Sequence, residues 1–546
     1  MECVTPCRVG VHWFRHGLRL HDNPALLELL RECDVFVPIF IFDGATGLSG
    51  ASKVSYNRMR FLLECLADLN SQLSNYGGCL YILHGEPTDV LRRIKHTIGL
   101  HRLSFDEDYE PIWHRRDAAV RQFCQQENVQ TIERGSHTLW DPRMVVKTNG
   151  GVAPLTYQMF LHTVRVLGPP PRPVEDVSLL NVTFGQISSS FSTDSVKIHH
   201  GVPTPEELGV HPETGLGERM VRWEGGETKA LRQLEERAAV EGTAFRQGQY
   251  LPNQAQPDLL GPPTSMSAAL STGCLSVRRF YWRIHDLYST IHHGHEAACE
   301  NITGQLVWRE YFYTMSLGNP NYDRVEGNSI CLDIPWRNSQ DKTTREMMER
   351  WRQGKTGYPF IDAAIRQMKQ EGWIHHVARN AIACFLTRGD LWISWVEGLQ
   401  FFLEQLIDAD WSVCAGNWLW VSSSAFEQLL DCDQCVCPVN FGRRLDPWGH
   451  YVKRYVPEVE HLPVKYIYEP WKASLEEQEK AKCVIGRDYP ERIVNHQQAS
   501  QANRQMMVRI RDSMVESRPQ HCCPSSVEEV RQFMWLPDQY SGHTHV

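Results

Sequence analysis

Short runs of β-branched and aromatic residues alternate with helical stretches near the start of the chain, and this alternation constrains the fold more than any other feature. The runs cover residues 9–14, 35–42, 79–83 and 102–105. Strands separated by helices form parallel sheets that are covered on both faces. One intervening helix is marked by a stripe of leucines at Leu62, Leu66, Leu69 and Leu73. The sequence therefore predicts an α/β domain over residues 7–139, with a doubly wound parallel sheet.

The pattern changes near residue 140. Glycines and the proline-rich segment 168–173 break regular structure and predict a connector over residues 140–214. From residue 215 to residue 512, leucine, tryptophan and phenylalanine recur at helical spacing, with few alternating runs. This second half is predicted to be a large all-α domain.

Residues 513–546 form a last unit, a C-terminal tail. Ser526 followed by Glu529 fits a capping box, and apolar residues recur after it on one helical face. Leaving the group Phe533, Met534 and Trp535 in water is costly, because their large apolar surfaces would stay exposed. The tail is therefore predicted to be a short amphipathic helix that docks into a groove, and a frayed terminus is the alternative.

Charge and cysteine content exclude several classes of protein. A formal net charge of −9 argues against a protein that coats nucleic acid, and no apolar stretch is long enough for a bilayer. No secretory signal is recognisable, so we expect a soluble intracellular protein with no membrane partner. The 17 cysteines are expected to be reduced thiols. The triplet Cys432, Cys435 and Cys437 has one metal-like spacing without a second pair, so we predict free thiols and no metal site.

The α/β half lacks a phosphate-binding loop of the GxGxxG type, so a nucleotide would have to bind elsewhere. Segment 263–267 has the composition of a helix start with hydroxyl groups, and Ser265 and Ser267 are the candidate contacts for a diphosphate. An ordinary helix cap is the alternative interpretation of these serines.

A cluster of charged residues is predicted in the second half. Segment 371–380 resembles a helix on which His375 or His376 lies three or four positions from Arg379. Asp408 and Asp410 supply two carboxylates, and Arg379 is a natural partner for one of them. A structural salt bridge inside a helical bundle is equally compatible with this spacing.

Tryptophans gather on either side of these acids. In segment 411–421, Gly416 permits close backbone approach and the aromatic groups surround a small polar niche that suits a planar ring. Upstream, Trp392 and Trp395 share a predicted helical stripe with Leu399, Phe402 and Leu406. Core packing is the ordinary role of such residues, and a chain of indoles that carries electrons to the surface is the alternative.

Three longer motifs point to one family. Residues 13–24 (WFRHGLRLHDNP), 351–357 (WRQGKTG) and 416–420 (GNWLW) occur in the order found in cryptochromes and photolyases, and residues 8–512 resemble that family throughout. The resemblance implies a photolyase-like fold whose all-α domain binds FAD. It also implies contacts with the cofactor by Arg237, Ser265, Ser267, Gln305, His376, Asp408, Asp410 and Asn417.

The resemblance assigns further roles near the flavin. It implies that Arg379 pairs with Asp408 beside the isoalloxazine, and that Cys414 faces flavin N5. It implies an electron relay formed by Trp418, Trp395 and Trp336, with Trp392 as a fourth member. The family usually has asparagine at this position in photolyases and aspartate in plant cryptochromes, whereas a buried thiol has a raised pKa and is a poor proton donor.

Cys414 and the tail both resemble the light-sensing insect-type cryptochromes, although Phe533-Met534-Trp535 differs from the usual Phe-Phe-Trp by one residue. The implied function is a blue-light photoreceptor in which His376 acts as a switch that releases the tail. The implied partners are the clock protein timeless and an F-box ubiquitin-ligase subunit, in cytoplasm and nucleus, without stable nucleic-acid binding. A DNA photolyase and a light-independent transcriptional repressor of the clock are the alternatives.

Overall fold

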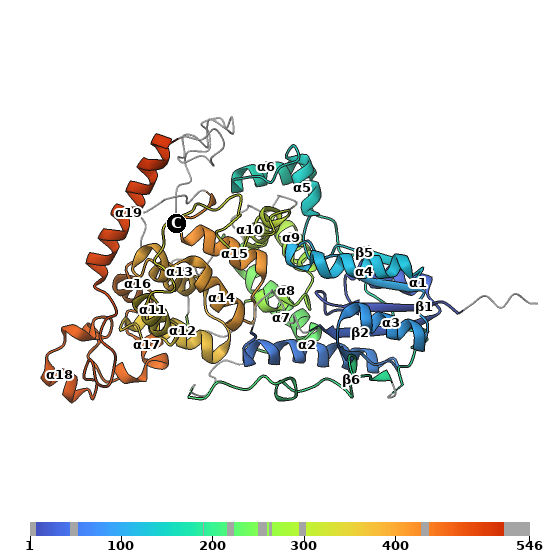
Figure 1. Cartoon of the computed structure of the whole chain (residues 1–546), viewed down its shortest axis with the longest axis horizontal. Coiled ribbons are helices and arrows are strands. Elements are labelled where there is room, and N and C mark those ends of the chain that lie inside the picture. The colour runs from blue at the N-terminus through green and yellow to red at the C-terminus, as the bar shows by residue number, and fades with distance from the viewer. Residues whose placement is uncertain are drawn as a thin grey trace, which may run out of the picture.

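The computed structural model contains an α/β domain built on one sheet and a larger all-helical domain (Figure 1). The predicted fold class is therefore confirmed. The residues that the structure describes are 7–43, 53–188, 191–215, 223–248, 259–260, 265–293, 302–426 and 436–517. The tail group of residues 533–535 and its predicted helix lie outside these residues.

The sheet has six strands in the order β5-β4-β1-β2-β3-β6. The first five strands are parallel, and β6 pairs antiparallel with β3 at one edge. All four predicted strands are present within two residues, whereas β5 and β6 were not predicted. The strand bounds are β1 Val9–Phe14, β2 Val35–Phe42, β3 Tyr81–His84, β4 Arg102–Asp106, β5 Gln130–Arg134 and β6 Lys197–His199.

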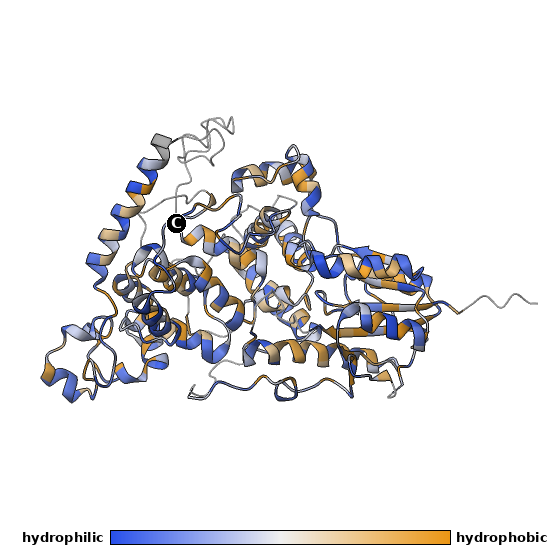
Figure 2. Ribbon diagram, in the orientation of Figure 1, coloured by the Kyte–Doolittle hydropathy of each residue, from blue (hydrophilic) through white to orange (hydrophobic). Residues whose placement is uncertain are grey.

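Helices cover both faces of this sheet. Phe36, Phe40 and Phe42 of β2 pack with helices α1 (Pro24–Glu32) and α2 (Tyr56–Ser74). The alternate residues Val37, Ile39 and Ile41 pack with α3 (Pro87–Thr97) and α4 (His114–Gln126). Successive side chains of a strand point to opposite faces of the sheet, so the apolar strand β2 contributes side chains to the cores on both faces. Figure 2 shows the strands as hydrophobic. The leucine stripe of α2 is buried as predicted.

The predicted connector carries regular structure of its own. Helices α5 (Pro142–Thr148) and α6 (Tyr157–Leu167) pack against each other and against α10 (Ile302–Ser316) of the helical domain. The chain then returns past the sheet and supplies the edge strand β6. This segment therefore joins the two domains by packing as well as by chain connection.

The helical domain surrounds one large apolar core, which contains Trp351, Trp395, Trp411 and Trp418. No helix among the described residues has a stretch long and apolar enough to cross a bilayer. Besides α10, the helices are α7 Glu227–Arg246, α8 Ser267–Ser271, α9 Val277–Ile291, α11 Lys342–Arg352, α12 Pro359–Glu371, α13 His376–Cys384, α14 Trp395–Gln405, α15 Trp411–Val421, α16 Pro438–Leu445, α17 His450–Tyr455, α18 Leu475–Lys480 and α19 His496–Ser517.

Two predicted helical segments are wrong in detail. Residues 371–380 do not form one helix, because α12 ends at Glu371, the capping residue Gly372 has φ +79°, and α13 begins only at His376. Trp392 does not belong to the stripe of Trp395, because it has φ +55° and precedes the Ser394 cap of α14. A residue with a left-handed backbone conformation cannot continue a right-handed helix. The chain therefore turns at both positions, where the apolar spacing alone predicts that the helix continues.

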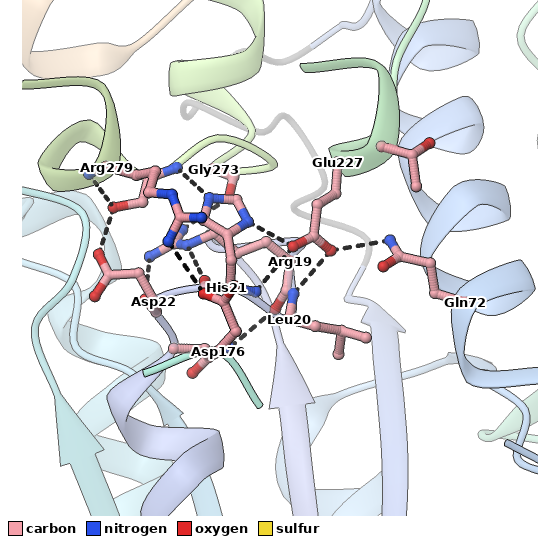
Figure 3. A network of polar contacts seen from close by, with 12 residues as sticks. Arg19, Leu20, His21, Asp22, Gln72, Asp176, Glu227, Gly273 and Arg279 are labelled. Carbon is pink, nitrogen blue, oxygen red and sulfur yellow. Dashed lines mark hydrogen bonds and ion pairs between the residues drawn. The ribbon is translucent and has the colours of Figure 1, made fainter. Parts of the chain in front are cut away.

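The loop after β1 fastens the two domains together (Figure 3). Buried Glu227, at the start of α7, accepts the backbone N–H groups of Leu20 and His21 at 2.8 Å each and the Gln72 amide at 2.9 Å. His21 Nε2 accepts the N–H of Ser276 at 3.0 Å, so its Nδ1–H is free to donate to Glu227. The motif at residues 13–24 therefore has a structural role at the domain interface.

Glu227→Ala is expected to lower the stability of the fold by about 3 kcal/mol or more, because buried donors are left without acceptors. The midpoint of urea unfolding, followed by tryptophan fluorescence, measures the effect. Glu236→Ala is the matched control, since Glu236 lies exposed on the same helix in a loose 3.9 Å pair with Arg232. It is expected to change stability by less than about 0.5 kcal/mol. Equal shifts in the two variants would contradict the role of Glu227.

Candidate functional site

Asp408, in the turn between α14 and α15, is the centre of a polar cluster in the helical domain. Its carboxylate forms a two-pronged ion pair with Arg379 of α13, with Nη1–Oδ1 at 3.1 Å and Nη2–Oδ2 at 2.8 Å. Ser267, the first residue of α8, donates its hydroxyl to Asp408 Oδ2 at 2.6 Å. The predicted pairing of Arg379 with Asp408 is therefore present, and it is the chemically preferred bidentate geometry.

Ser265 and Trp373 extend this cluster. The hydroxyl oxygens of Ser265 and Ser267 are 2.9 Å apart, and the Trp373 indole N–H donates to Ser267 Oγ at 3.3 Å. Trp373 was not predicted as a site residue. Its position two residues before His375, in the turn that breaks the predicted helix, was the available signal. The cluster thus combines two hydroxyls, an indole N–H and an ion pair.

His376 and Cys414 differ in environment. The exposed His376 begins α13 three residues before Arg379, and its pKa is lowered by partial desolvation and by the Arg379 charge. Cys414 lies buried in α15, where burial raises the pKa of its thiol to about 12. His376 is therefore neutral at pH 7, and Cys414 remains a thiol that gives up its proton with difficulty.

Asp410 is turned to a different set of partners. It caps α15 by accepting the N–H of Val413 at 3.1 Å, and it accepts the hydroxyl of Tyr313. His137 of the α/β half lies 3.9 Å away. Burial opposes ionisation of Asp410, but His137, Arg309 and Tyr313 together outweigh it and lower its pKa to about 2. Asp410 therefore joins α15 to α10 and to the other domain, apart from the contacts of Asp408.

Among the described residues, no hydrogen bond or ion pair joins the remaining predicted cofactor contacts Arg237, Asn417 and Gln305 to this cluster. Arg237 forms an ion pair with Glu241 inside α7. Asn417 is exposed on α15 and donates to its own helix at Val413 O, 2.8 Å away. Gln305 is exposed on α10. The structure therefore brings Ser265, Ser267, Arg379 and Asp408 together directly, with His376 beside them on α13.

Two tryptophans predicted for the relay lie in the core of the helical domain. The buried ring of Trp418 packs edge-on against Phe402 at 4.9 Å. A Cβ on Gly398 would meet the Trp418 ring at 2.1 Å, so α14 and α15 approach this closely only with glycine at that position. Trp395, at the start of α14, is fully buried in the same core cluster.

The other two tryptophans form a pair further out. Trp336 and Trp392 have ring centroids 4.9 Å apart. Trp392 clusters with Ile334 and with Met507 of α19, while Trp336 packs against both that cluster and the core that holds Trp395 and Trp418. Trp336 therefore lies between the cluster that holds the inner tryptophans and the cluster that holds Trp392. Among the described residues, no ring stacking joins Trp395 directly to another tryptophan.

The donor groups fit a flavin dinucleotide. Serine hydroxyls can donate hydrogen bonds to a diphosphate. The Arg–Asp pair offers N–H donors next to carboxylate acceptors, which match the C=O and N–H groups along one edge of a flavin ring. Gln305 and Asn417 are exposed polar side chains on otherwise buried helices, and His376 is exposed at the start of α13, so a ligand could reach all three. No group of three or more potential metal ligands occurs in the described part of the chain, and Cys432 and Cys435 lie outside it.

A parallel α/β domain joined to a helical domain with this donor set defines a flavoprotein of the photolyase type. The family model described as the FAD binding domain of DNA photolyase matches residues 302–509, and the model described as DNA photolyase matches residues 10–175. Cryptochrome-1 of Drosophila melanogaster is 51% identical, covering 97% of this chain and 98% of that protein. Cryptochrome-1 of Gallus gallus is 44% identical, covering 92% of this chain and 78% of that protein.

Solved structures agree on the fold. A class III photolyase from Agrobacterium tumefaciens has a TM-score of 0.76 at 24% identity, over 94% of this chain and 99% of that one. A Synechocystis cryptochrome has a TM-score of 0.75 at 23% identity, over 93% and 100%. The chain belongs to the cryptochrome and photolyase family, and within it to the insect-type cryptochromes. It is a flavoprotein photoreceptor of the cryptochrome/photolyase type, with FAD as its cofactor.

Proposed function

We propose that this chain is a blue-light photoreceptor that moves an electron along Trp418, Trp395, Trp336 and Trp392 and thereby releases its C-terminal tail. The observation that carries the proposal is that Trp336 packs both against the core cluster that contains Trp418 and Trp395 and against the cluster that Trp392 forms with Met507 of α19. FAD, when bound, absorbs blue light and accepts one electron. Ser265, Ser267, Arg379 and Asp408 would hold it.

The tryptophans supply that electron. The Trp418 indole N–H is buried without a hydrogen-bond partner among the described residues, so an oxidised Trp418 has no nearby base to take its proton. The positive hole is then free to pass outward instead of being trapped as a neutral radical. The half-buried Trp336 and its neighbour Trp392 are the end of this path.

In this proposal, His376 responds to the new negative charge on the flavin and thereby releases the tail. It is neutral in the dark, because desolvation and Arg379 both lower its pKa. A negative charge gained beside it favours the imidazolium, as any neighbouring anion does. A change of charge at His376 would loosen the docked tail group Phe533, Met534 and Trp535, and the released tail would expose a surface for partners.

The proposed partners are the clock protein timeless and an F-box ubiquitin-ligase subunit, met in the cytoplasm and nucleus during light entrainment of the circadian clock. The support is the similarity to insect Cryptochrome-1 proteins over nearly the whole chain. The net charge of −9 supports protein partners over nucleic acid.

DNA repair is the second candidate function, because photolyases share this fold. A photolyase would take a flipped pyrimidine lesion into the site that the tail is proposed to fill. The buried Cys414 thiol, with its pKa raised to about 12, supports the photoreceptor over the repair enzyme. Light-dependent restoration of ultraviolet-damaged oligonucleotides by the purified protein would favour repair.

Blue light is expected to make the tail at least several-fold more sensitive to trypsin, because Arg531 becomes accessible when the tail leaves its groove. The rate of cleavage in the tail, measured by mass spectrometry in darkness and in light, tests this. Cleavage elsewhere in the same molecule is the internal control. Equal tail cleavage in darkness and light, in a sample whose flavin is fully photoreduced, would contradict tail release.

A further inference from the structure

Arg58, the third residue of α2, is a cation buried between the two domains. Only 2% of the residue is exposed. Its Nη1 donates to the carbonyl of Leu403, in the last turn of α14, and its Nη2 donates to the carbonyl of Ala409 at 3.1 Å. Arginine is almost never fully buried in proteins, because its charge is costly to remove from water. The position of this charge therefore needs an explanation.

One part of the explanation is the end of α14. The last carbonyl groups of a helix have no partner within it. Ser55, which caps α2, donates its N–H to Glu404 O at 2.9 Å and its hydroxyl to Gln405 O at 3.1 Å. Arg58 donates to Leu403 O, and the helix dipole favours a cation at this end. Capping of α14 accounts for the Nη1 contact, but a neutral donor would satisfy a carbonyl as well.

The Nη2 contact places Arg58 against a turn that carries two acids. Ala409 lies between Asp408, which pairs with Arg379, and Asp410. In the part of the chain that the structure describes, Asp410 forms no ion pair with any arginine or lysine. Two carboxylates therefore lie in one buried turn, and Arg379 compensates the charge of one of them.

Arg58 supplies a positive charge that balances the second acid. Arg309 also acts on Asp410, but it is paired with Glu310 at 2.7 Å. Burial lowers the pKa of Arg58 to about 10, although Cys414 and the acids of this turn oppose that change. Arg58 therefore keeps its charge at pH 7. Without it, the turn would hold a surplus negative charge in a buried environment, where charges interact strongly.

We propose that Arg58 is a positioning residue for the flavin site, which holds the turn that carries Asp408 and favours electron uptake by FAD through its buried positive charge. The proposal rests on the proposed placement of FAD at the Asp408 cluster. A fixed buried cation stabilises negative charge that is gained in its neighbourhood. The Cys414 thiol, with its pKa raised to about 12, is a poor source of a proton that would neutralise this charge instead. A cap for α14 alone would not affect electron uptake.

Equilibrium redox titration of the holoprotein in darkness tests the proposal, with flavin absorbance as the measure of reduction. In Arg58→Met, the equilibrium constant for uptake of one electron is expected to fall on the order of tenfold, which lowers the midpoint potential by about 59 mV. Arg58→Lys is expected to keep this constant within about threefold of the wild-type value, because the cation remains. Titration of apoprotein with FAD is expected to show several-fold weaker binding by both variants, since lysine lacks the planar fork that spans the two carbonyls.

Arg60→Met is the matched control, because Arg60 lies two residues further along α2 and has a side chain only 12% exposed. It pairs with Glu64 at 2.5 Å and donates to Trp223 O at 3.0 Å, and no hydrogen bond among the described residues joins it to the turn at Asp408. Its removal is expected to leave the midpoint potential and the FAD affinity unchanged. Urea unfolding of each variant separates a loss of stability from a change at the flavin.

An unchanged midpoint potential in Arg58→Met, or an equal shift in Arg60→Met, would overturn the proposal and reduce Arg58 to a cap of α14. If Arg58→Met yields no folded holoprotein, Arg58→Gln decides, because it keeps an amide donor for a carbonyl without the charge. A wild-type potential in Arg58→Gln would likewise refute the electrostatic role. These measurements need neither light nor the tail, so the relay and tail release can fail without affecting the result. Asp408→Asn tests the placement of FAD by itself, because flavin loss in that variant does not depend on Arg58.

Discussion

Replacing Trp418 with phenylalanine is expected to slow light-driven reduction of FAD by on the order of 100-fold, about 2.7 kcal/mol at 1.36 kcal/mol per tenfold. Phenylalanine keeps an aromatic ring against Phe402 but is far harder to oxidise than an indole. Trp418 is the proposed relay member on α15, the helix that also carries Cys414. The rate at which the blue absorption of oxidised flavin disappears under illumination measures the effect.

Trp411→Phe is the matched control for this experiment. Trp411 begins the same helix, is equally buried, and likewise has an indole N–H without a partner among the described residues. It packs against Tyr322, outside the proposed relay. Each variant removes a similar ring volume, so a common loss of stability of about 1–3 kcal/mol is expected. Photoreduction that survives in Trp418→Phe and fails in Trp411→Phe would refute the relay as drawn.

The sheet shows which strands a sequence can reveal. Strands β1 and β2 were predicted to the residue, because nearly every side chain in them is buried and apolar runs mark them. Strand β5 has one buried residue, Ile132, and β6 spans three residues at the edge. An edge strand is defined by its hydrogen bonds to a neighbour, and its side chains need not be apolar. Local composition therefore carries no signal for either one.

The site shows a similar division. That Arg379 pairs with one of the two acids was predictable, because a buried charge needs an opposite charge, and the family resemblance selected Asp408. The different orientation of Asp410 was not predictable, since its partners Tyr313 and His137 come from segments far away in the sequence. The hydrogen bonds that Glu227 accepts from the loop after β1 were not predicted, for the same reason. Long-range hydrogen bonds depend on the relative placement of the two domains, and no local pattern records that placement.

Replacing Asp408 with asparagine is expected to weaken FAD binding by at least about tenfold. Breaking a buried ion pair by removing one partner costs about 3–5 kcal/mol, and Arg379 keeps enough exposure to recover part of that in water. The rest of this free energy is expected to be lost from FAD binding, because Asp408 would no longer hold Ser267 and Arg379 in place. The ratio of flavin to protein absorbance after purification gives the occupancy, and titration of apoprotein with FAD gives the affinity.

Asp410→Asn is the control that distinguishes the two acids. Asp410 is as buried as Asp408 and lies two residues further along, but its contacts run to Val413, Tyr313 and His137. Asparagine retains an oxygen for the helix cap, so this variant should lose stability at the domain interface while it keeps most of its FAD. If Asp410→Asn loses the flavin and Asp408→Asn keeps it, the cluster around Asp408 is a structural salt bridge, and the cofactor is held from the side of α10 and the α/β domain.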